Sequence, residues 1–226
     1  MKFVEREPQK ILDDLILRYP VLAVCKKDIA KAYSTLRDCY QQGGKLLVAG
    51  NGGSAADAEH MVGELMKSFH KPRPLPASFQ QNLAATDPVL GTYLAKTLEQ
   101  PLPAIALVCH EALSTAFLND KDGKAVFAQQ LLGYGKKGDV FLGISTSGNS
   151  ENVICVAVVA KALGISVIEL TGKHVGRLNQ FADISIRVPE VETFKIQELH
   201  LPVYHCLCLM LESCFWNRNE NSERSL

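Results

Sequence analysis

The sequence predicts an α/β fold, a three-layer αβα sandwich with a central parallel sheet of five strands. Short apolar runs alternate along the chain with longer segments of helical spacing, which is the order of β–α units in a parallel sheet. The apolar runs lack alternating polar residues, as expected for strands covered by helices on both faces. With 226 residues, the chain is long enough for one such domain, and we expect a single domain over residues 1–226.

The N-terminal part, about residues 1–43, is predicted to be a helical extension of this sandwich. Apolar residues recur at helical spacing over residues 11–18 and 25–42. Pro20 separates these two predicted helices, and the pair of glycines at 43 and 44 ends the second one.

The alternation of strands and helices begins after these glycines. The predicted strands cover residues 45–49, 105–109, 139–144, 165–170 and 184–188. Helices are predicted over residues 54–66, 125–132 and 151–163, and a long apolar C-terminal helix over 192–216. The segment 78–100 interrupts this alternation and is interpreted as an insertion of mixed helical character.

Composition and charge restrict the class of protein. Lys plus Arg and Asp plus Glu each total 24, which argues against a protein that binds bulk nucleic acid through a basic face. No apolar run approaches the roughly 20 residues of a membrane span, and the charged first ten residues lack the apolar core of a signal peptide. The seven cysteines are odd in number and contain no CxxC, so we expect reduced thiols in a cytoplasmic protein.

Two small polar loops each follow a predicted strand and precede a predicted helix. The first begins the run GNGGSAADAEH at Gly50–His60, and the second is GISTSGNS at Gly143–Ser150. Backbone N–H groups at such strand-to-helix turns bind anions, and hydroxyl groups suit phosphate oxygens. Neither loop matches the P-loop or the GxGxxG pattern, which favours a sugar phosphate over a nucleotide. Ordinary tight turns that start helices are the alternative for both loops.

Four residues on two predicted helices have side chains that suit a metal site. His60 and Glu64 are four residues apart on a predicted helix and share one face. Gln197 and His205 are eight residues apart on the C-terminal helix, with Pro202 between them. Imidazole and carboxylate both suit Zn²⁺. Spacing alone, however, favours a surface pair for His60 and Glu64 and a core or interface residue for His205.

Together these motifs resemble the sugar isomerase (SIS) domain family, and within it the bacterial phosphoheptose isomerases. The resemblance covers about residues 26–216. The motifs that carry it are GNGGSxxDAxH at 50–60, Glu64, Asn119–Asp120, GISTSGNS at 143–150, and Gln197-Glu198-x-His200 with His205.

The resemblance implies a role for each matching residue. It implies one zinc ion per subunit, bound by His60, Glu64, Gln197 and His205, and a homotetramer. It implies that Glu64 and His205 form the acid/base pair. The residues implied to contact the sugar phosphate are Asn51, Gly52, Gly53, Glu64, Asn119, Asp120, Ser145, Thr146, Ser147, Ser150 and Gln197.

The implied activity is that of a ketose–aldose isomerase. It would convert sedoheptulose 7-phosphate to D-glycero-D-manno-heptose 7-phosphate through an enediol, in heptose precursor biosynthesis. Two alternatives stay open, an isomerase for a different phosphosugar and a non-catalytic SIS protein that binds a phosphosugar or a replication initiator. Two departures bear on the substrate: Ser68 stands where the family often has an arginine, and the segment 78–100 is extra.

Overall fold

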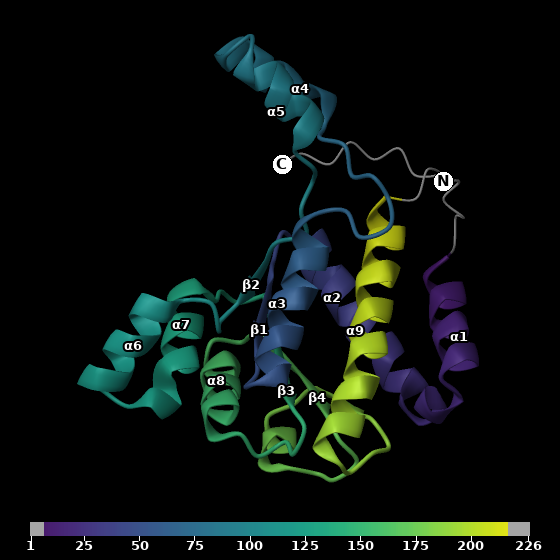
Figure 1. Cartoon of the computed structure of the whole chain (residues 1–226), viewed down its shortest axis with the longest axis vertical. Helices are drawn as coiled ribbons and strands as arrows, with labels where there is room; N and C mark the ends of the chain where they lie inside the picture. The colour runs from purple at the N-terminus through teal and green to yellow at the C-terminus, as the bar shows by residue number, and fades with distance from the viewer. Residues whose placement is uncertain (1–6, 217–226) are drawn as a thin grey trace.

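The computed structural model of the chain describes residues 7–216 and contains the five-stranded parallel sheet that the sequence predicts (Figure 1). The strands lie in the order β2-β1-β3-β4-β5. Their bounds are β1 Leu46–Ala49, β2 Ala104–Ala106, β3 Val140–Ser145, β4 Ser166–Thr171 and β5 Ile184–Arg187. Strand β2 is shorter than its predicted run 105–109 because its register with β1 ends at the pair of Val48 and Ala106, after one last hydrogen bond from the N–H of Leu107 to the carbonyl of Val48 at 2.9 Å.

Helices cover both faces of the sheet. The helices α2 (Lys26–Gln41), α3 (Gly53–Met66) and α9 (Thr193–Phe215) cover one face, and α7 (Val126–Tyr134) and α8 (Glu151–Ala162) cover the other. Successive residues of β1 alternate between the two layers, since Leu46 and Val48 pack in the first core and Leu47 and Ala49 in the second. The predicted three-layer sandwich is therefore confirmed.

The N-terminal and C-terminal helices agree with the sequence analysis. Helix α1 (Pro8–Arg18) packs against α9, and a 3₁₀ segment, η1 (Pro20–Cys25), leads into α2. Residues 1–6 of the predicted extension lie outside the described part of the chain. Within residues 7–216, no helix combines the length and the apolar character that crossing a membrane requires.

The segment interpreted as an insertion forms a helical hairpin. Helices α4 (Ala77–Thr86) and α5 (Leu90–Thr97) pack against each other and project beyond the upper end of the sheet in Figure 1. The isolated bridge between Pro74 and Glu99 closes the base of the hairpin.

Three further short helices were not among the predicted elements. They are α6 (Glu111–Asp120) and the 3₁₀ segments η2 (Gly123–Ala125) and η3 (Arg177–Gln180). Helix α6 buries none of its residues, and Phe117 alone of this helix packs at the edge of the core.

The register of the sheet brings the two polar loops together. Strands β1 and β3 are neighbours, and Ala49 at the end of β1 lies opposite Gly143 in β3. Because both strands are parallel, the loops that follow them leave the same edge of the sheet. This edge is the usual place for a ligand in a parallel α/β fold.

Candidate active site

Two histidines and a glutamate meet where α3 packs against α9. Nε2 of His60 lies 3.3 Å from Oε1 of Glu64, one turn further along α3. Nε2 of His205, on α9, lies 3.5 Å from Nε2 of His60. The His60 side chain is 43% exposed and that of Glu64 is 15% exposed, so solvent and small molecules can reach the group. Residues far apart in the sequence therefore form one accessible cluster of acid/base groups.

Neighbouring side chains hold this cluster in place. The ring of Phe69 packs against His205 with centroids 5.2 Å apart, and the ring of Tyr204 packs against His60 at 5.6 Å. Lys67 approaches the second carboxylate oxygen of Glu64, with Nζ 3.2 Å from Oε2. Burial lowers the pKa of His205, and the nearby His60 lowers it further, while Glu64 acts in the opposite direction. The surroundings thus favour neutral imidazole at His205.

The spacing of the donor atoms fits zinc only in part. A tetrahedral ion with bonds of about 2.0–2.1 Å separates its ligand atoms by about 3.4 Å, close to the 3.3 and 3.5 Å found here. Within residues 7–216, however, no three His, Cys, Asp or Glu side chains already form a group that could hold a metal. The donor groups and the two distances between donor atoms fit a zinc ion. The described side chains do not, however, form a complete metal site.

Gln197 lies away from this cluster, against the first polar loop. A Cβ at Gly53 would come within 2.5 Å of Nε2 of Gln197, so a larger residue at position 53 would displace the end of this side chain. The eight residues between Gln197 and His205 span about 12 Å of helix. The structure therefore places Gln197 with Gly53 and places His205 with His60 and Glu64.

The first loop adopts a conformation that glycine allows. Gly52 has a φ of 56° and caps the N-terminus of α3, which begins at Gly53. The side-chain amides of Asn51 and Asn152 donate to each other at 2.9 and 2.8 Å. Because Asn152 belongs to the first turn of α8, this amide pair ties the first loop to the helix that follows the second.

The second loop is braced from below by the segment after β4. The Cα of Gly176 packs on Gly148, whose φ is 66°, so closely that a Cβ on Gly176 would lie 2.4 Å from the Gly148 carbonyl. The N–H of Leu178 donates to this carbonyl at 2.9 Å. These contacts fix the shape of the loop before any ligand arrives.

The hydroxyl groups of the second loop do not form an ordinary helix cap. Ser150 is the N-cap residue of α8, yet its side chain makes no capping hydrogen bond. Its Oγ lies 2.9 Å from Oγ of the buried Ser145. Thr146 is half-buried and Ser147 exposed, so the loop presents hydroxyls at the N-terminal end of a helix, where anions are stabilised.

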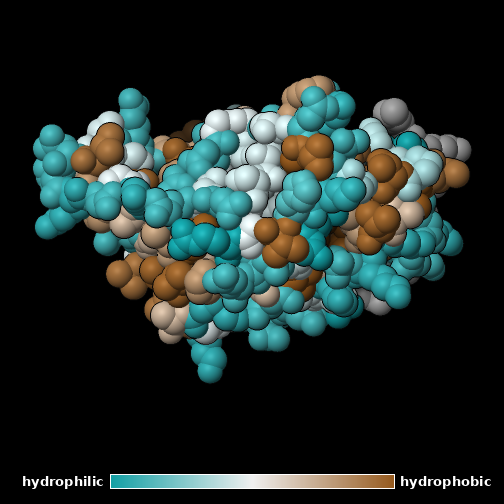
Figure 2. Space-filling model, turned by 90° about the horizontal axis from the view of Figure 1, so that it is seen from below, coloured by the Kyte–Doolittle hydropathy of each residue, from teal (hydrophilic) through white to brown (hydrophobic). Residues whose placement is uncertain are grey.

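Figure 2 views this edge of the molecule from below. A pale band of residues of intermediate hydropathy crosses the middle of the view, with hydrophilic and hydrophobic residues on either side. Such a band is expected where loops rich in glycine, serine and threonine reach the surface.

Comparison with known proteins identifies the family. The profile of the SIS domain matches residues 20–94 and 91–172. The chain belongs to the SIS domain family. The phosphoheptose isomerase of Shewanella pealeana is 33% identical over 222 residues, which cover 97% of this chain and all of that protein.

The solved structures that resemble this chain also include phosphoheptose isomerases of the SIS family. A phosphoheptose isomerase from Francisella tularensis is 31% identical with a TM-score of 0.68, over 88% of this chain and 97% of that one. The phosphoheptose isomerase from Neisseria gonorrhoeae is 29% identical with a TM-score of 0.67, over 91% of both chains. Such relatives match nearly the whole length, and this SIS protein is an isomerase.

Two residues of the resemblance lie elsewhere in the SIS domain. Asn119 and Asp120 end helix α6, which packs against α7 and η2 at the left edge of Figure 1. Both are exposed, and Nδ2 of Asn119 donates to Oδ1 of Asp120 at 2.8 Å. The described chain does not bring this pair to the histidine cluster.

A buried ion pair that the sequence analysis did not predict lies at the C-terminal end of α3, next to the backbone of Glu64. Arg73 and Glu212 are both buried and lie 2.8 Å apart. The guanidinium of Arg73 also donates to the backbone carbonyls of Glu64 and Leu65, at 3.1 and 2.6 Å. Carbonyls at the end of a helix need such donors. Arg73 therefore caps the C-terminal end of α3 beneath Glu64. The signal in the sequence was the charged Glu212 in the otherwise apolar run of residues 206–216.

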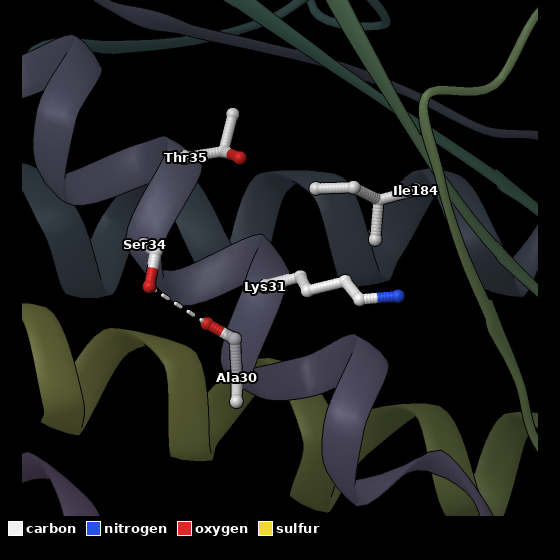
Figure 3. Close-up of a pocket in the computed structure, with 5 residues that line it drawn as sticks. All are labelled: Ala30, Lys31, Ser34, Thr35 and Ile184. Atoms are coloured by element: carbon white, nitrogen blue, oxygen red, sulfur yellow. Dashed lines mark hydrogen bonds between the residues drawn. The ribbon is translucent and has the colours of Figure 1, made fainter.

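A separate groove lies between α2 and β5. It is open, has a volume of about 460 Å³ and is lined by Ala30, Lys31, Ser34, Thr35 and Ile184 (Figure 3). The hydroxyl of Ser34 donates to the carbonyl of Ala30. The groove contains none of the predicted site residues and has no acid/base pair, so we place the chemistry at the α3–α9 contact.

Proposed function

We propose that this SIS protein is a ketose–aldose isomerase that converts sedoheptulose 7-phosphate to D-glycero-D-manno-heptose 7-phosphate. The observation that carries the proposal is the meeting of His60, Glu64 and His205 between α3 and α9, beside two braced polar loops. The names of its relatives support the substrate. A protein that only binds a phosphosugar would not need this accessible cluster of acid/base groups.

The polar loops would hold the substrate. Hydroxyls of Ser145, Thr146, Ser147 and Ser150 suit the phosphate, and Asn51, Gly52, Gly53 and Gln197 line the path toward the histidines. Binding the phosphate in a preformed loop fixes the reacting carbons relative to Glu64 and His205. Asn119 and Asp120 would add contacts only from a neighbouring subunit or after movement of α6.

Glu64 and His205 would move the protons of the reaction. One of them takes a proton from C1 of the ketose, next to the carbonyl, and the pair returns a proton to C2 and transfers one between O1 and O2. An enediol lies between the two steps. Carboxylate and neutral imidazole suit this work, and general acid/base catalysis of this kind contributes typically 10²–10⁴-fold.

Zinc is the metal that the donor groups fit best. His60, Glu64 and His205 would hold it, with Gln197 as the fourth ligand after a movement of its side chain. When bound, the ion would polarise the substrate carbonyl.

We further propose a cytoplasmic homotetramer. Leu17 in α1 is 79% exposed and Val24 in η1 is 69% exposed, and burial of such side chains between subunits would stabilise an assembly. The seven free thiols suit a reducing compartment. Light scattering tests the assembly, since a particle of 24.8 kDa would be a monomer and would contradict it.

A matched pair of variants tests the proposed role of Glu64. Glu64→Gln removes the carboxylate that exchanges protons, so we expect kcat for sedoheptulose 7-phosphate to fall by about 10²-fold or more. Glu59→Gln makes the same change at an exposed position of the same helix and should leave kcat within about twofold. Equal rates for wild type and Glu64→Gln would exclude Glu64 from the chemistry, and circular dichroism checks that both variants fold.

A further inference from the structure

We propose that Tyr204, held by Asp57, is a positioning residue that fixes which nitrogen of His60 faces the active site. The hydroxyl of Tyr204 lies 3.0 Å from Nδ1 of His60 and 3.2 Å from Oδ1 of Asp57. The inference rests on the proposed function where it concerns the metal, and on the geometry alone where it concerns the proton of His60.

Counting hydrogens assigns the direction of both hydrogen bonds. A carboxylate can only accept, so the single hydrogen of the Tyr204 hydroxyl is donated to Asp57. The tyrosine oxygen must then accept from His60, and Nδ1 carries a proton. Nε2 is left as the nitrogen that faces Glu64 and His205.

Burial makes this arrangement hard to avoid. Tyr204 is 1% exposed, so its hydroxyl cannot find water in place of its two partners. The other carboxylate oxygen of Asp57 is buried and has no hydrogen-bond partner among the described residues. Losing the tyrosine hydroxyl would therefore leave Asp57 without its side-chain donor in a place that water reaches poorly.

Aromatic contacts keep the rings of this group fixed. The ring of Tyr204 lies edge-on to both imidazoles, with centroids 5.6 Å from His60 and 5.1 Å from His205. The two imidazoles are themselves edge-on, 4.9 Å apart. A change at Tyr204 that keeps the ring and removes only the oxygen isolates the hydrogen bonds from the packing.

The consequence concerns the tautomer of a neutral His60, whose single ring proton would be held at Nδ1. A proton fixed at Nδ1 leaves the lone pair of Nε2 beside Glu64 and His205, where three electron-rich atoms converge. Partners of this kind behind a metal-binding histidine typically contribute 10–100-fold to metal affinity.

The test compares Tyr204→Phe with Tyr40→Phe as its control. Tyr40 lies in α2, is also buried, and its hydroxyl has no hydrogen-bond partner among residues 7–216. Nitrogen-15 NMR of His60, assigned with His60→Asn, reports the protonation of each ring nitrogen with and without zinc. Competition with a chromophoric chelator gives the zinc dissociation constant, and thermal unfolding checks each fold.

We expect Nδ1 of His60 to be protonated in the wild type and in Tyr40→Phe. We expect Tyr204→Phe to shift the His60 nitrogen signals and to weaken zinc binding by about 10–100-fold, with Tyr40→Phe within about twofold. In Asp57→Ala the tyrosine hydroxyl is free to donate to Nδ1, so the protonated nitrogen should change to Nε2.

Two results would overturn the inference. One is an unprotonated Nδ1 in the wild type, and the other is a Tyr204→Phe variant with unchanged His60 signals and zinc affinity. A wild type that binds no zinc would remove the metal from the proposed function. The nitrogen signals of the metal-free protein would then decide the role of Tyr204 by themselves.

Discussion

Two histidines five residues apart on α9 show how the surroundings of a side chain decide its role. His205 is half-buried and meets His60 and Glu64 at the surface of the helix pair. His200 is fully buried next to the end of β4, and burial lowers its pKa to about 4. One histidine is available for proton transfer, and the other is part of the core.

The low pKa of His200 predicts a loss of stability in mild acid. A histidine in the unfolded chain has a pKa of about 6.5. Between pH 6.5 and 4, His200 is therefore protonated in the unfolded chain but stays neutral in the folded protein. The free energy of unfolding therefore falls as the pH falls through this window, by about 3 kcal/mol from this residue. Urea unfolding at several pH values measures it.

His200→Leu is the control for this prediction. It removes the titrating group from a buried site and keeps a side chain of similar volume. The difference in unfolding free energy between the two proteins should change between pH 6.5 and 4, since other groups titrate alike in both. Parallel curves over this range would show that His200 is not held neutral.

At the scale of single residues, the sequence indicated the contact within one helix of the site. The spacing of His60 and Glu64 predicts a shared helix face, and the structure places them 3.3 Å apart. The approach of His205 depends on how α9 packs against α3, which spacing within one helix cannot give. Tyr204 lies in an apolar helix and reads as a core residue, so its hydrogen bonds to His60 and Asp57 were not predictable.

At the scale of elements, the strands were predictable because they are buried on both faces. All four residues of β1 and all six of β3 are buried, which gives the uninterrupted apolar runs of the sequence. The hairpin α4–α5 was not predicted as two helices. None of the residues of α4 is buried, and Gly91 alone is buried in α5, so the hairpin adds almost nothing to the core of the domain.

The same exposure predicts that the hairpin can be removed without unfolding the domain. Its base is fixed by the N–H of Gln100, which donates to the carbonyl of Arg73 at 2.8 Å, and by the bridge between Pro74 and Glu99. Replacing residues 77–97 with about four Gly and Ser residues keeps these contacts and shortens the connection. We expect the melting temperature to change by only about 3 °C, as followed by circular dichroism.

A substitution at the base of the hairpin gives the loss of stability with which this deletion is compared. Arg73→Met leaves the buried carboxylate of Glu212 without its ion-pair partner, with the backbone N–H groups of residues 69–71 still donating to it, and should cost about 3 kcal/mol. A deletion of 77–97 that destabilises the protein as strongly as Arg73→Met would show that the hairpin is part of the folding unit.

At the scale of the whole molecule, the topology of the sheet assembles the site. The neighbouring positions of β1 and β3 bring together loops that are about 90 residues apart, and the parallel packing of α3 and α9 starts both helices at the same edge. The two polar loops thus lie at the edge where α3 and α9 begin, and the acid/base cluster lies further along these two helices. The proposed function uses this arrangement, in which the loops would hold the phosphate and the reacting carbons would lie further along α3.

The central claim is that this molecule isomerises a phosphorylated ketose by proton transfer. Proton NMR of sedoheptulose 7-phosphate incubated with the enzyme in D₂O tests it most directly. The account predicts D-glycero-D-manno-heptose 7-phosphate with solvent deuterium at C2, because the enediol is reprotonated there. No turnover of this or of shorter ketose phosphates, or an aldose product free of deuterium at C2, would contradict it.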